Sequence, residues 1–499
     1  MVSLDGESLS LEQVSAVAMK SEPVSLAASS LEKMRRSRAV VEHLAEGEEP
    51  VYGVNTGVGR LADVRIAKED LEQLQRNIVR SHACGVGDPL SREEVRAMML
   101  IRANVLAKGF SGIRPVVAER LCDLLNHDII PVVPSRGSVG ASGDLAPLAH
   151  MALVLIGEGE AEFEGARWQG GEALRRAGSP PLTLASKEGV SLLNGTQAML
   201  AVGCLQLHAA EILADAADLA CAMTIDALRG TPRAFDPRLQ QVRPHPGQLR
   251  SAANLARLLD GSEIRASHIS CRRVQDAYSL RCAPQVHGAA RDALSEARRI
   301  FAIELNSATD NPLVFEDEIL SGGNFHGQPL ALVLDYMAIA MTALAGISER
   351  RIDRLVNPER NEGLPPFLAA HAGLESGFMM AQVTAAALAA ENRTLAAPAS
   401  PGSITTSGDK EDFVSMGMTA ALKLKQVVTN TRTVLAIEMM TGARALDCLA
   451  PLRSSPMIEK LRMCLREITP PYETDRPLSA DIERIALCIS HGGPSDLLA

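Results

Sequence analysis

Aromatic side chains are scarce in this chain of 499 residues: they make up 3% of it, with one tryptophan and four tyrosines. Each tyrosine is therefore informative. Tyr336 lies in an apolar run and is expected in the core, whereas Tyr472 follows two prolines and is expected in a loop. Tyr52 and Tyr278 instead lie in polar, glycine-rich or charge-rich stretches. Those two tyrosines are the candidates for a functional role.

An excess of positive charge is also missing. Acidic residues outnumber basic ones by 60 to 50, which gives a formal net charge of −10. A negative chain repels nucleic acid and anionic membrane surfaces. We therefore expect neither a nucleic acid nor a membrane as a partner.

Paired cysteines are missing as well, since the nine cysteines are scattered with no CxxC motif. The first residues lack the charged and apolar regions of a secretion signal. Both features favour a reduced, cytoplasmic setting. His268 and Cys271 are spaced as metal ligands could be, but no second pair completes a site, so no metal is expected.

The longest apolar run, residues 330–347, reaches the length of a membrane span only by including Asp335. A buried core helix is the better interpretation of this run. Three other long segments are rich in alanine and leucine and nearly free of proline, as helices of a large bundle are: residues 192–228, 285–308 and 415–445.

Shorter signals complete the expected fold. Ser91 and Glu94 have the spacing of a capping box at the start of a helix that Gly109 ends, and residues 160–171 alternate as a small hairpin would. We predict a mainly α protein with a long central helical bundle, a smaller loop-rich N-terminal part and minor β-hairpins. No linker composition interrupts residues 1–499, which are expected to form one domain. Its N-terminal part is 1–200, and the long-helix bundle with the C-terminal helices is 201–499.

The stretch GSVGASGDLAPLAH, residues 137–150, fits neither a phosphate loop nor a dinucleotide-binding motif. An ordinary glycine turn is one interpretation. A chemical one is that the amide nitrogen of Gly143 attacks the carbonyl carbon of Ala141, and that Ser142 loses its hydroxyl to become a methylene. Glycine leaves the attacking amide unhindered. The product would be a methylidene-imidazolone, a strong electrophile made without an external cofactor.

This stretch, with its GDLAPL continuation, resembles the signature of the aromatic amino acid ammonia-lyases. The resemblance covers nearly the whole chain, through VYGVNTGVGRL, LLNGTQAML, RVQDAYSLRCAPQV, DNPLVF, SGGNFHGQP and ENRTLAAPAS. It implies a mostly helical homotetramer whose active sites are each built from several chains. It also implies that residues 141–143 form 4-methylidene-imidazol-5-one, and that residues 1–200 carry this electrophile loop.

The resemblance gives the two polar-context tyrosines a role. Ammonia is a poor leaving group and the β-proton of an amino acid is barely acidic, so the reaction needs both an electrophile and a base. Tyr278 matches the position of the base, and Tyr52 that of a helper or substrate contact. A phenol acts as a base near neutral pH if its pKa is lowered.

Four further positions match substrate-binding positions of the family. Arg281 lies three residues after Tyr278, and its fork suits a substrate carboxylate. Asn194 and Gln275 match residues that bind the carboxylate or support the electrophile, and Phe325 matches an aromatic ring beside it. Without the resemblance, Arg281 would be interpreted as part of a surface ion pair and Phe325 as a core residue. Asn194 and Gln275 would be interpreted as turn or cap residues.

Two markers concern the substrate. The pair Ser81-His82 is similar to that of family members acting on histidine, whereas Phe-Leu or His-Leu is typical of those acting on phenylalanine or tyrosine. An imidazole requires polar partners, because an unpaired buried ring nitrogen costs about 1 to 3 kcal/mol. Glu411 can accept a hydrogen bond from the imidazole, although an acid in the first turn of a helix is its ordinary interpretation. The chain departs from the pattern of the histidine-acting members at Val58, Ala277, Ser279 and Phe413.

The resulting hypothesis is elimination of ammonia from the small molecule L-histidine to give trans-urocanate, the first step of histidine degradation. A tyrosine or phenylalanine lyase, or an aminomutase that adds ammonia back at the β-carbon, is the alternative within the family. A non-catalytic helical assembly protein is the alternative of another class.

Overall fold

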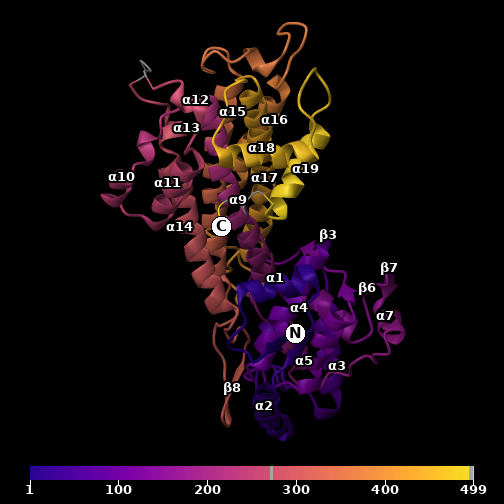
Figure 1. Ribbon diagram of the computed structural model, residues 1–499. Coiled ribbons are helices and arrows are strands. Elements are labelled where there is room, and N and C mark those ends of the chain that lie inside the picture. Colours follow the sequence, from indigo (N-terminus) through magenta and orange to yellow (C-terminus); the bar gives the residue numbers. More distant parts are fainter. Residues whose placement is uncertain (270–273, 494–497, 499) are drawn as a thin grey trace. The chain divides into compact units, whose positions relative to one another are not determined.

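The computed structural model describes residues 1–269, 274–493 and 498. The chain is mainly α, as expected, and divides into two compact units (Figure 1). Unit 1 consists of Met1–Leu205, Arg298–Asp335 and Pro398–Leu422, and unit 2 of Gln206–Ala297, Tyr336–Ala397 and Lys423–Ala499. Unit 1 thus adds two later segments of the chain to the N-terminal part.

Unit 1 contains eight of the described helices in its first segment: α1 (Leu11–Lys20), α2 (Ala28–Glu46), α3 (Leu71–His82), α4 (Arg92–Ala107), α5 (Pro115–Asn126), α6 (Leu145–Leu155), α7 (Gly170–Arg176) and α8 (Glu188–Leu193). The capping box predicted at Ser91 and Glu94 starts α4, and Gly109 follows its end with a φ of +87°. Nearly all residues of α4 are buried, so this helix is the centre of the core of unit 1.

The described strands form only small sheets. Strands β6 (Glu160–Phe163) and β7 (Ala166–Gln169) make the predicted hairpin, and β4 (Ile130–Pro131) pairs with β6 to complete a three-stranded sheet. Three two-stranded pairs accompany it: β1 (Val2–Leu4) with β2 (Val24–Leu26), β3 (Val86–Pro89) with β5 (Pro134–Arg136), and β8 (Leu313–Phe315) with β9 (Glu318–Leu320).

Four long helices continue from one unit into the other: α9 (Gln197–Ala227), α14 (Ala283–Glu304), α15 (Gln328–Val356) and α17 (Gly417–Asp447). They confirm the long helical segments predicted from composition, with one difference. The segment 192–228 is not one helix, because α8 ends at Leu193 and α9 begins at Gln197. Gly195 lies between them with a φ of +155°, which a helix does not contain.

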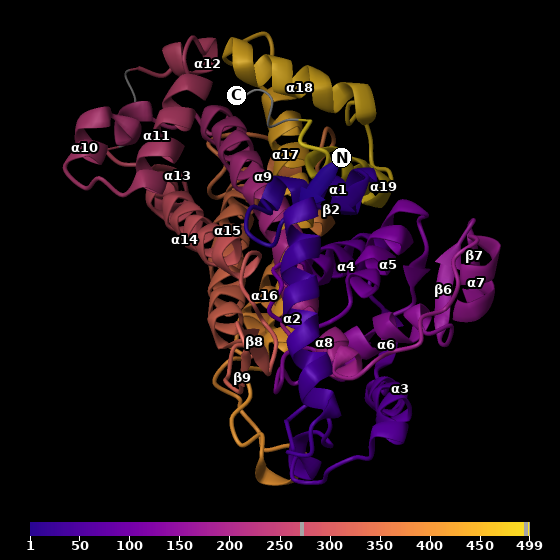
Figure 2. The same ribbon diagram turned by 90° about the horizontal axis from the view of Figure 1, so that it is seen from below.

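In unit 2, the long helices lie side by side (Figure 2). Thr224 on α9 and Ser348 on α15 both donate hydrogen bonds to the buried carboxylate of Glu438 on α17. His287 on α14 lies 2.7 Å from Asp218 on α9, and Glu438 on α17 binds Arg351 on α15. The other described helices of this unit are α10 (Pro237–Gln241), α11 (Pro246–Leu258), α12 (Glu263–Ala266), α13 (Tyr278–Arg281), α16 (Met379–Leu395), α18 (Pro456–Ile468) and α19 (Ser479–Ser490).

Tyr336 was expected in the core, and that expectation is wrong: its side chain is 47% exposed. Leu332 and Ile339 are 57% and 45% exposed on the same face of α15, because residues spaced three and four apart share one side of a helix. Tyr472 does lie in a loop, where it is buried against Phe378.

Helices α9 and α15 are long and apolar enough to span a membrane by composition, but 67% and 61% of their apolar windows are buried within the protein. This burial fits the interpretation of residues 330–347 as part of a buried helix. Within the described residues no cluster of possible metal ligands occurs, and Cys271 lies outside them.

Candidate active site

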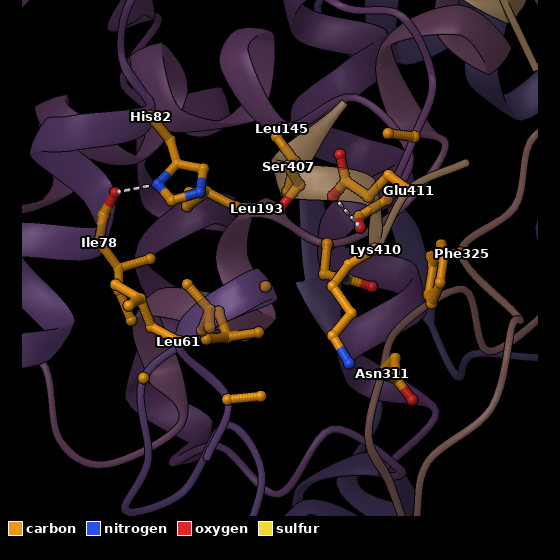
Figure 3. A pocket seen from close by; sticks show the side chains of 18 of the residues that line it. Leu61, Ile78, His82, Leu145, Leu193, Asn311, Phe325, Ser407, Lys410 and Glu411 are labelled. Atoms are coloured by element: carbon orange, nitrogen blue, oxygen red, sulfur yellow. Dashed lines mark hydrogen bonds between the residues drawn. The ribbon is translucent and has the colours of Figure 1, made fainter. Parts of the chain in front are cut away.

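A cavity of about 690 Å³ in unit 1 brings together most of the residues singled out from the sequence (Figure 3). Eight of them line it: Tyr52, Ser81, His82, Ala141, Ser142, Asn194, Phe325 and Glu411. They come from segments spread over more than half of the chain. The cavity is large enough for an amino acid with an aromatic ring.

The glycine-rich stretch forms a tight loop in front of α6. Ser138 donates a hydrogen bond from Oγ to Oδ1 of Asp144 at 2.9 Å, and the backbone N–H of Met199 donates to Oδ2 at 2.8 Å. Asp144 is fully buried, and this burial raises the pKa of its carboxyl to about 6 despite both hydrogen bonds. The loop is thus fixed from the inside by a buried acid.

Gly143 packs backbone to backbone against Gly195. The two residues form a parallel bridge, and the N–H of Asp144 donates to the carbonyl oxygen of Gly195 at 2.7 Å. A Cβ atom on Gly143 would lie 2.1 Å from that oxygen, and the φ of Gly143 is +74°. Glycine is therefore required here by space and by backbone conformation, in addition to the chemical reason given above.

Ser142 and Glu411 are in direct contact. The hydroxyl of Ser142 donates to Oε1 of Glu411 at 3.2 Å, while Thr406 donates to Oε2 at 2.7 Å. These hydrogen bonds hold the carboxylate of Glu411 at the tripeptide. The helix α17 begins only at Gly417, so Glu411 is not in its first turn and the ordinary interpretation of this acid does not apply.

His82, the last residue of α3, lies on the opposite side of the cavity from Glu411 in Figure 3. Its Nδ1 is 2.8 Å from the carbonyl oxygen of Ile78. Because a carbonyl only accepts, Nδ1 carries the proton in this contact, and Nε2 of the neutral ring is the acceptor. Ser81 lies beside it, with Oγ 3.1 Å from Nδ1 of His82. The cavity thus has two acceptors suited to an imidazole N–H, His82 and Glu411.

Tyr52 does not have the lowered pKa that the sequence analysis considered for a phenolic base. Burial raises the pKa of Tyr52, and the negative charges of Glu411 and Asp310 raise it further. A buried phenol near carboxylates keeps its proton at neutral pH. Tyr52 therefore enters this cavity as a hydrogen-bond donor.

Asn194 caps the C-terminus of α8 and is buried at the cavity wall. Its backbone carbonyl accepts a hydrogen bond from Arg102 at 2.8 Å. Its side-chain oxygen is buried without a hydrogen-bond partner among the described residues. A buried polar atom without a partner is costly and marks a place where a ligand can bind.

The other three predicted residues, Gln275, Tyr278 and Arg281, belong to unit 2. Tyr278 begins α13 and is 71% exposed, and the guanidinium of Arg281 lies 4.6 Å from the centre of its ring. Gln275 lines a separate cavity of about 350 Å³ in unit 2. Tyr278 and Arg281 are neighbours, as their spacing predicts, but these three do not line the cavity that contains Ser142.

Lys410 is a lining residue that the sequence analysis did not select. It is the one lysine or arginine among the cavity residues of unit 1, beside Glu411 and Asp412. Its position in a charged, loop-like stretch was the available signal, but nothing in the local sequence shows that this loop returns to the tripeptide.

Comparison with known proteins agrees with this geometry. The family described as aromatic amino acid lyase matches residues 9–467. The chain is 56% identical to a histidine ammonia-lyase from Koribacter versatilis over 98% of both chains. It is 40% identical to the crystal structure of a histidine ammonia-lyase from Trypanosoma cruzi, with a TM-score of 0.92 over 100% of this chain and 94% of that one. It is also 40% identical to a tyrosine aminomutase from Streptomyces globisporus, with a TM-score of 0.94 over 99% and 98%.

Proposed function

The chain belongs to the aromatic amino acid lyase family, and we propose that it eliminates ammonia from L-histidine to give trans-urocanate, the first step of histidine degradation. The observation that carries the choice of substrate is the placement of His82 and Glu411 in the cavity that contains Ser142. An imidazole N–H is satisfied by either acceptor, whereas a phenyl ring offers no donor to Nε2 of His82.

The proposed electrophile is 4-methylidene-imidazol-5-one formed from Ala141, Ser142 and Gly143, with no external cofactor. The residues present fit this group, because Gly143 has the required lack of a Cβ atom and Ser142 has its hydroxyl at the cavity. The electrophile supplies a carbon that accepts electron density from the substrate, which makes departure of ammonia easier. The side chains around it bind and orient the substrate.

The substrate-binding roles follow from the positions of the side chains. His82 accepts from the imidazole through Nε2, and Glu411 accepts from the imidazole or from the ammonium group. Asn194 offers its unpartnered side-chain oxygen, and Phe325 offers a ring in the same cavity as the tripeptide. We assign the substrate carboxylate to Arg281, with Gln275 supporting it.

Tyr278 is assigned as the base that removes the β-proton, and Tyr52 as the hydrogen-bonding helper. Gln275, Tyr278 and Arg281 do not line the cavity that contains Ser142, and we propose that the protein is a homotetramer whose active sites each combine residues of several chains. The exposed apolar side chains of α15 and α16 support this assembly, among them Leu332, Ile339 and Met380. We propose a cytoplasmic location, with no nucleic acid or membrane partner.

The first test is the accurate mass of the peptide spanning residues 137–150 from purified protein. We expect a deficit of two waters relative to the encoded sequence. An unmodified peptide in folded protein would contradict the electrophile.

The second test compares histidine, tyrosine and phenylalanine as substrates, with product formation followed by ultraviolet absorbance. We expect histidine to be consumed fastest. Histidine as the poorest of the three would contradict the assignment. The high structural similarity to an aminomutase makes it necessary to analyse the same reaction for β-histidine, whose accumulation in place of urocanate would identify a mutase.

A further inference from the structure

Arg102 is a fully buried arginine of α4 that the proposed reaction does not use. Its guanidinium donates to the carbonyl oxygens of Ser191 and Asn194, the latter at 2.8 Å, and to Oε1 of Gln197 at 3.0 Å. These acceptors lie on both sides of the break between α8 and α9. Arg102 therefore joins the end of α8 to the start of α9 across the interruption at residues 194–196.

The interruption is in direct contact with the tripeptide. Gly195 pairs with Gly143 on one face, and a Cβ atom added to Gly195 would lie 2.6 Å from Nη1 of Arg102 and 2.5 Å from the carbonyl oxygen of Thr309. Gly195 thus has no free space toward Arg102, and Gly143 has none toward Gly195. A shift of the guanidinium moves Gly195 and, with it, the backbone of Gly143.

The charges around Arg102 show that it is not needed merely to neutralise a carboxylate. Oδ2 of Asp310 lies 4.0 Å from Arg102 and 3.5 Å from Nζ of Lys187, and all three side chains are fully buried. Two cations thus accompany one carboxylate. Burial lowers the pKa of Arg102 to about 10, so the guanidinium stays protonated at neutral pH. An uncharged residue at this position would still leave Asp310 beside Lys187.

We infer that Arg102 is the positioning residue for formation of the electrophile, holding Gly195 so that the backbone nitrogen of Gly143 is pressed toward the carbonyl carbon of Ala141. This inference rests on the proposed function. The new bond joins that nitrogen and that carbon. The first water takes the oxygen of Ala141 and the amide hydrogens of Ser142 and Gly143. The second water takes the hydroxyl and the Cα hydrogen of Ser142, so no oxidant is needed.

The test compares Arg102→Lys with Arg96→Lys. Both arginines lie on α4 and are buried, but Arg96 binds the carbonyl oxygens of Val17 and Leu125 and the carboxylate of Asp128, and has no contact with the interruption. Lysine keeps the charge and loses the fork that binds several acceptors at once. The mass of peptide 137–150 is followed with time after synthesis, in protein shown to be folded by circular dichroism and thermal unfolding.

We expect Arg96→Lys to be less stable to heat than wild type. Its tripeptide should nevertheless eliminate two waters at the wild-type rate. In Arg102→Lys the loss of water should be at least about tenfold slower, since one charge-assisted hydrogen bond corresponds to about that factor. Cyclisation of Arg102→Lys at the wild-type rate would overturn the inference. If wild-type protein itself lacks the mass deficit, the proposed function fails rather than the role of Arg102.

If Arg102→Lys does not fold, a milder variant tests whether the contacts of Arg102 control the rate of cyclisation. Gln197→Leu removes one acceptor of the guanidinium, together with the hydrogen bond that Gln197 donates to Thr309, and leaves the carbonyl acceptors of Arg102 unchanged. We expect folded Gln197→Leu protein to cyclise more slowly than wild type and Arg96→Lys. Equal rates in all three proteins would also overturn the inference.

Discussion

Ser142 has a different role before and after the proposed cyclisation. In the unmodified chain its hydroxyl donates a hydrogen bond to Glu411, and after cyclisation its methylene is the proposed electrophile. Ser142→Ala removes the only source of that methylene. We expect activity to fall by about three orders of magnitude or more with the fold unchanged. Turnover with histidine and the mass of peptide 137–150 provide the measurement.

The matched control is Ser135→Ala, on β5 upstream of the same loop and outside the cavity lining. It should keep both wild-type turnover and the deficit of two waters. Near-normal turnover in Ser142→Ala would refute the electrophile.

Lys410 provides a second prediction for a single residue. Lys410 is the one lysine or arginine of unit 1 that lines the cavity, so its ammonium can bind the substrate carboxylate together with Arg281. Lys410→Met should raise KM for histidine about tenfold and change kcat by no more than a few fold, because a binding contact is lost rather than a reacting group. Initial rates over a range of histidine concentrations separate the two constants.

Lys68→Met, which removes an exposed lysine of unit 1 paired with Glu46, should leave KM unchanged and excludes a general effect of net charge. A wild-type KM in Lys410→Met would show that this ammonium does not contact the substrate.

Single residues could be predicted from the sequence where a local pattern names them. Ser142 lies in a distinctive tripeptide, and the adjacent residues Ser81 and His82 form a pair that indicates the substrate. The raised pKa of Tyr52 could not be predicted, because its causes include the charges of Glu411 and Asp310, which lie hundreds of positions away. The position of Lys410 in the cavity could not be predicted for the same reason, because the residues beside it in space are distant in the sequence.

At the scale of elements, the buried charges between the long helices of unit 2 make stability depend on pH. His287 faces Asp218 on α9, Arg351 on α15 and Glu438 on α17. Burial, helped by the charge of Arg351, lowers the pKa of His287 although Asp218 opposes the shift. In the unfolded chain histidine has a pKa of about 6.5. The unfolded state thus binds a proton that the folded state does not, so stability is lost as pH falls below about 6.5.

His287→Gln should therefore show a smaller drop in melting temperature than wild type when pH falls from about 7.5 to about 5.5, although it is less stable at the higher pH. Thermal unfolding at several pH values measures this difference. His127→Gln, at an exposed histidine, should follow the wild-type curve. Parallel curves for His287→Gln and wild type would show that His287 does not titrate between the two states.

Helices were predicted well because alanine and leucine runs, capping residues and the absence of proline are local signals. The break between α8 and α9 was not predicted, because most of the segment 192–228 is rich in alanine and leucine, although Asn194 and Gly195 are turn-forming residues. The structure adds a tertiary reason for the break: Gly195 is extended, pairs with Gly143 and lies against Arg102. The local turn signal and the long-range contact therefore agree at this position.

At the scale of the whole molecule, the proposed assembly makes a prediction that single variants cannot. Ser142→Ala and Tyr278→Phe should each be almost inactive. If each active site combines Ser142 of one chain with Tyr278 of another, co-expression of the two variants should restore a clear fraction of wild-type activity, because some sites then receive both intact residues.

Each variant carries a different affinity tag, and the activity is measured in protein purified by both tags in succession. The control is a mixture of the two variants that were folded separately and do not exchange chains. No activity in the doubly tagged protein would indicate that both residues of a site come from the same chain. The sequence implied shared sites only through its resemblance to the family, because no local pattern states which chain supplies a side chain.

The close packing of Gly195 against Gly143 and Arg102 also bears on when the electrophile can form during synthesis of the chain. The groups packed around Gly195 include the carbonyl oxygen of Thr309, which lies far along the chain from Gly143. A ribosome that has translated only the first 200 codons holds a chain with the tripeptide but without the residue that closes the space behind Gly195. If the methylene forms only with these contacts in place, it is made after synthesis has passed residue 309, so that the cysteine thiols of the nascent chain are not exposed to the electrophile.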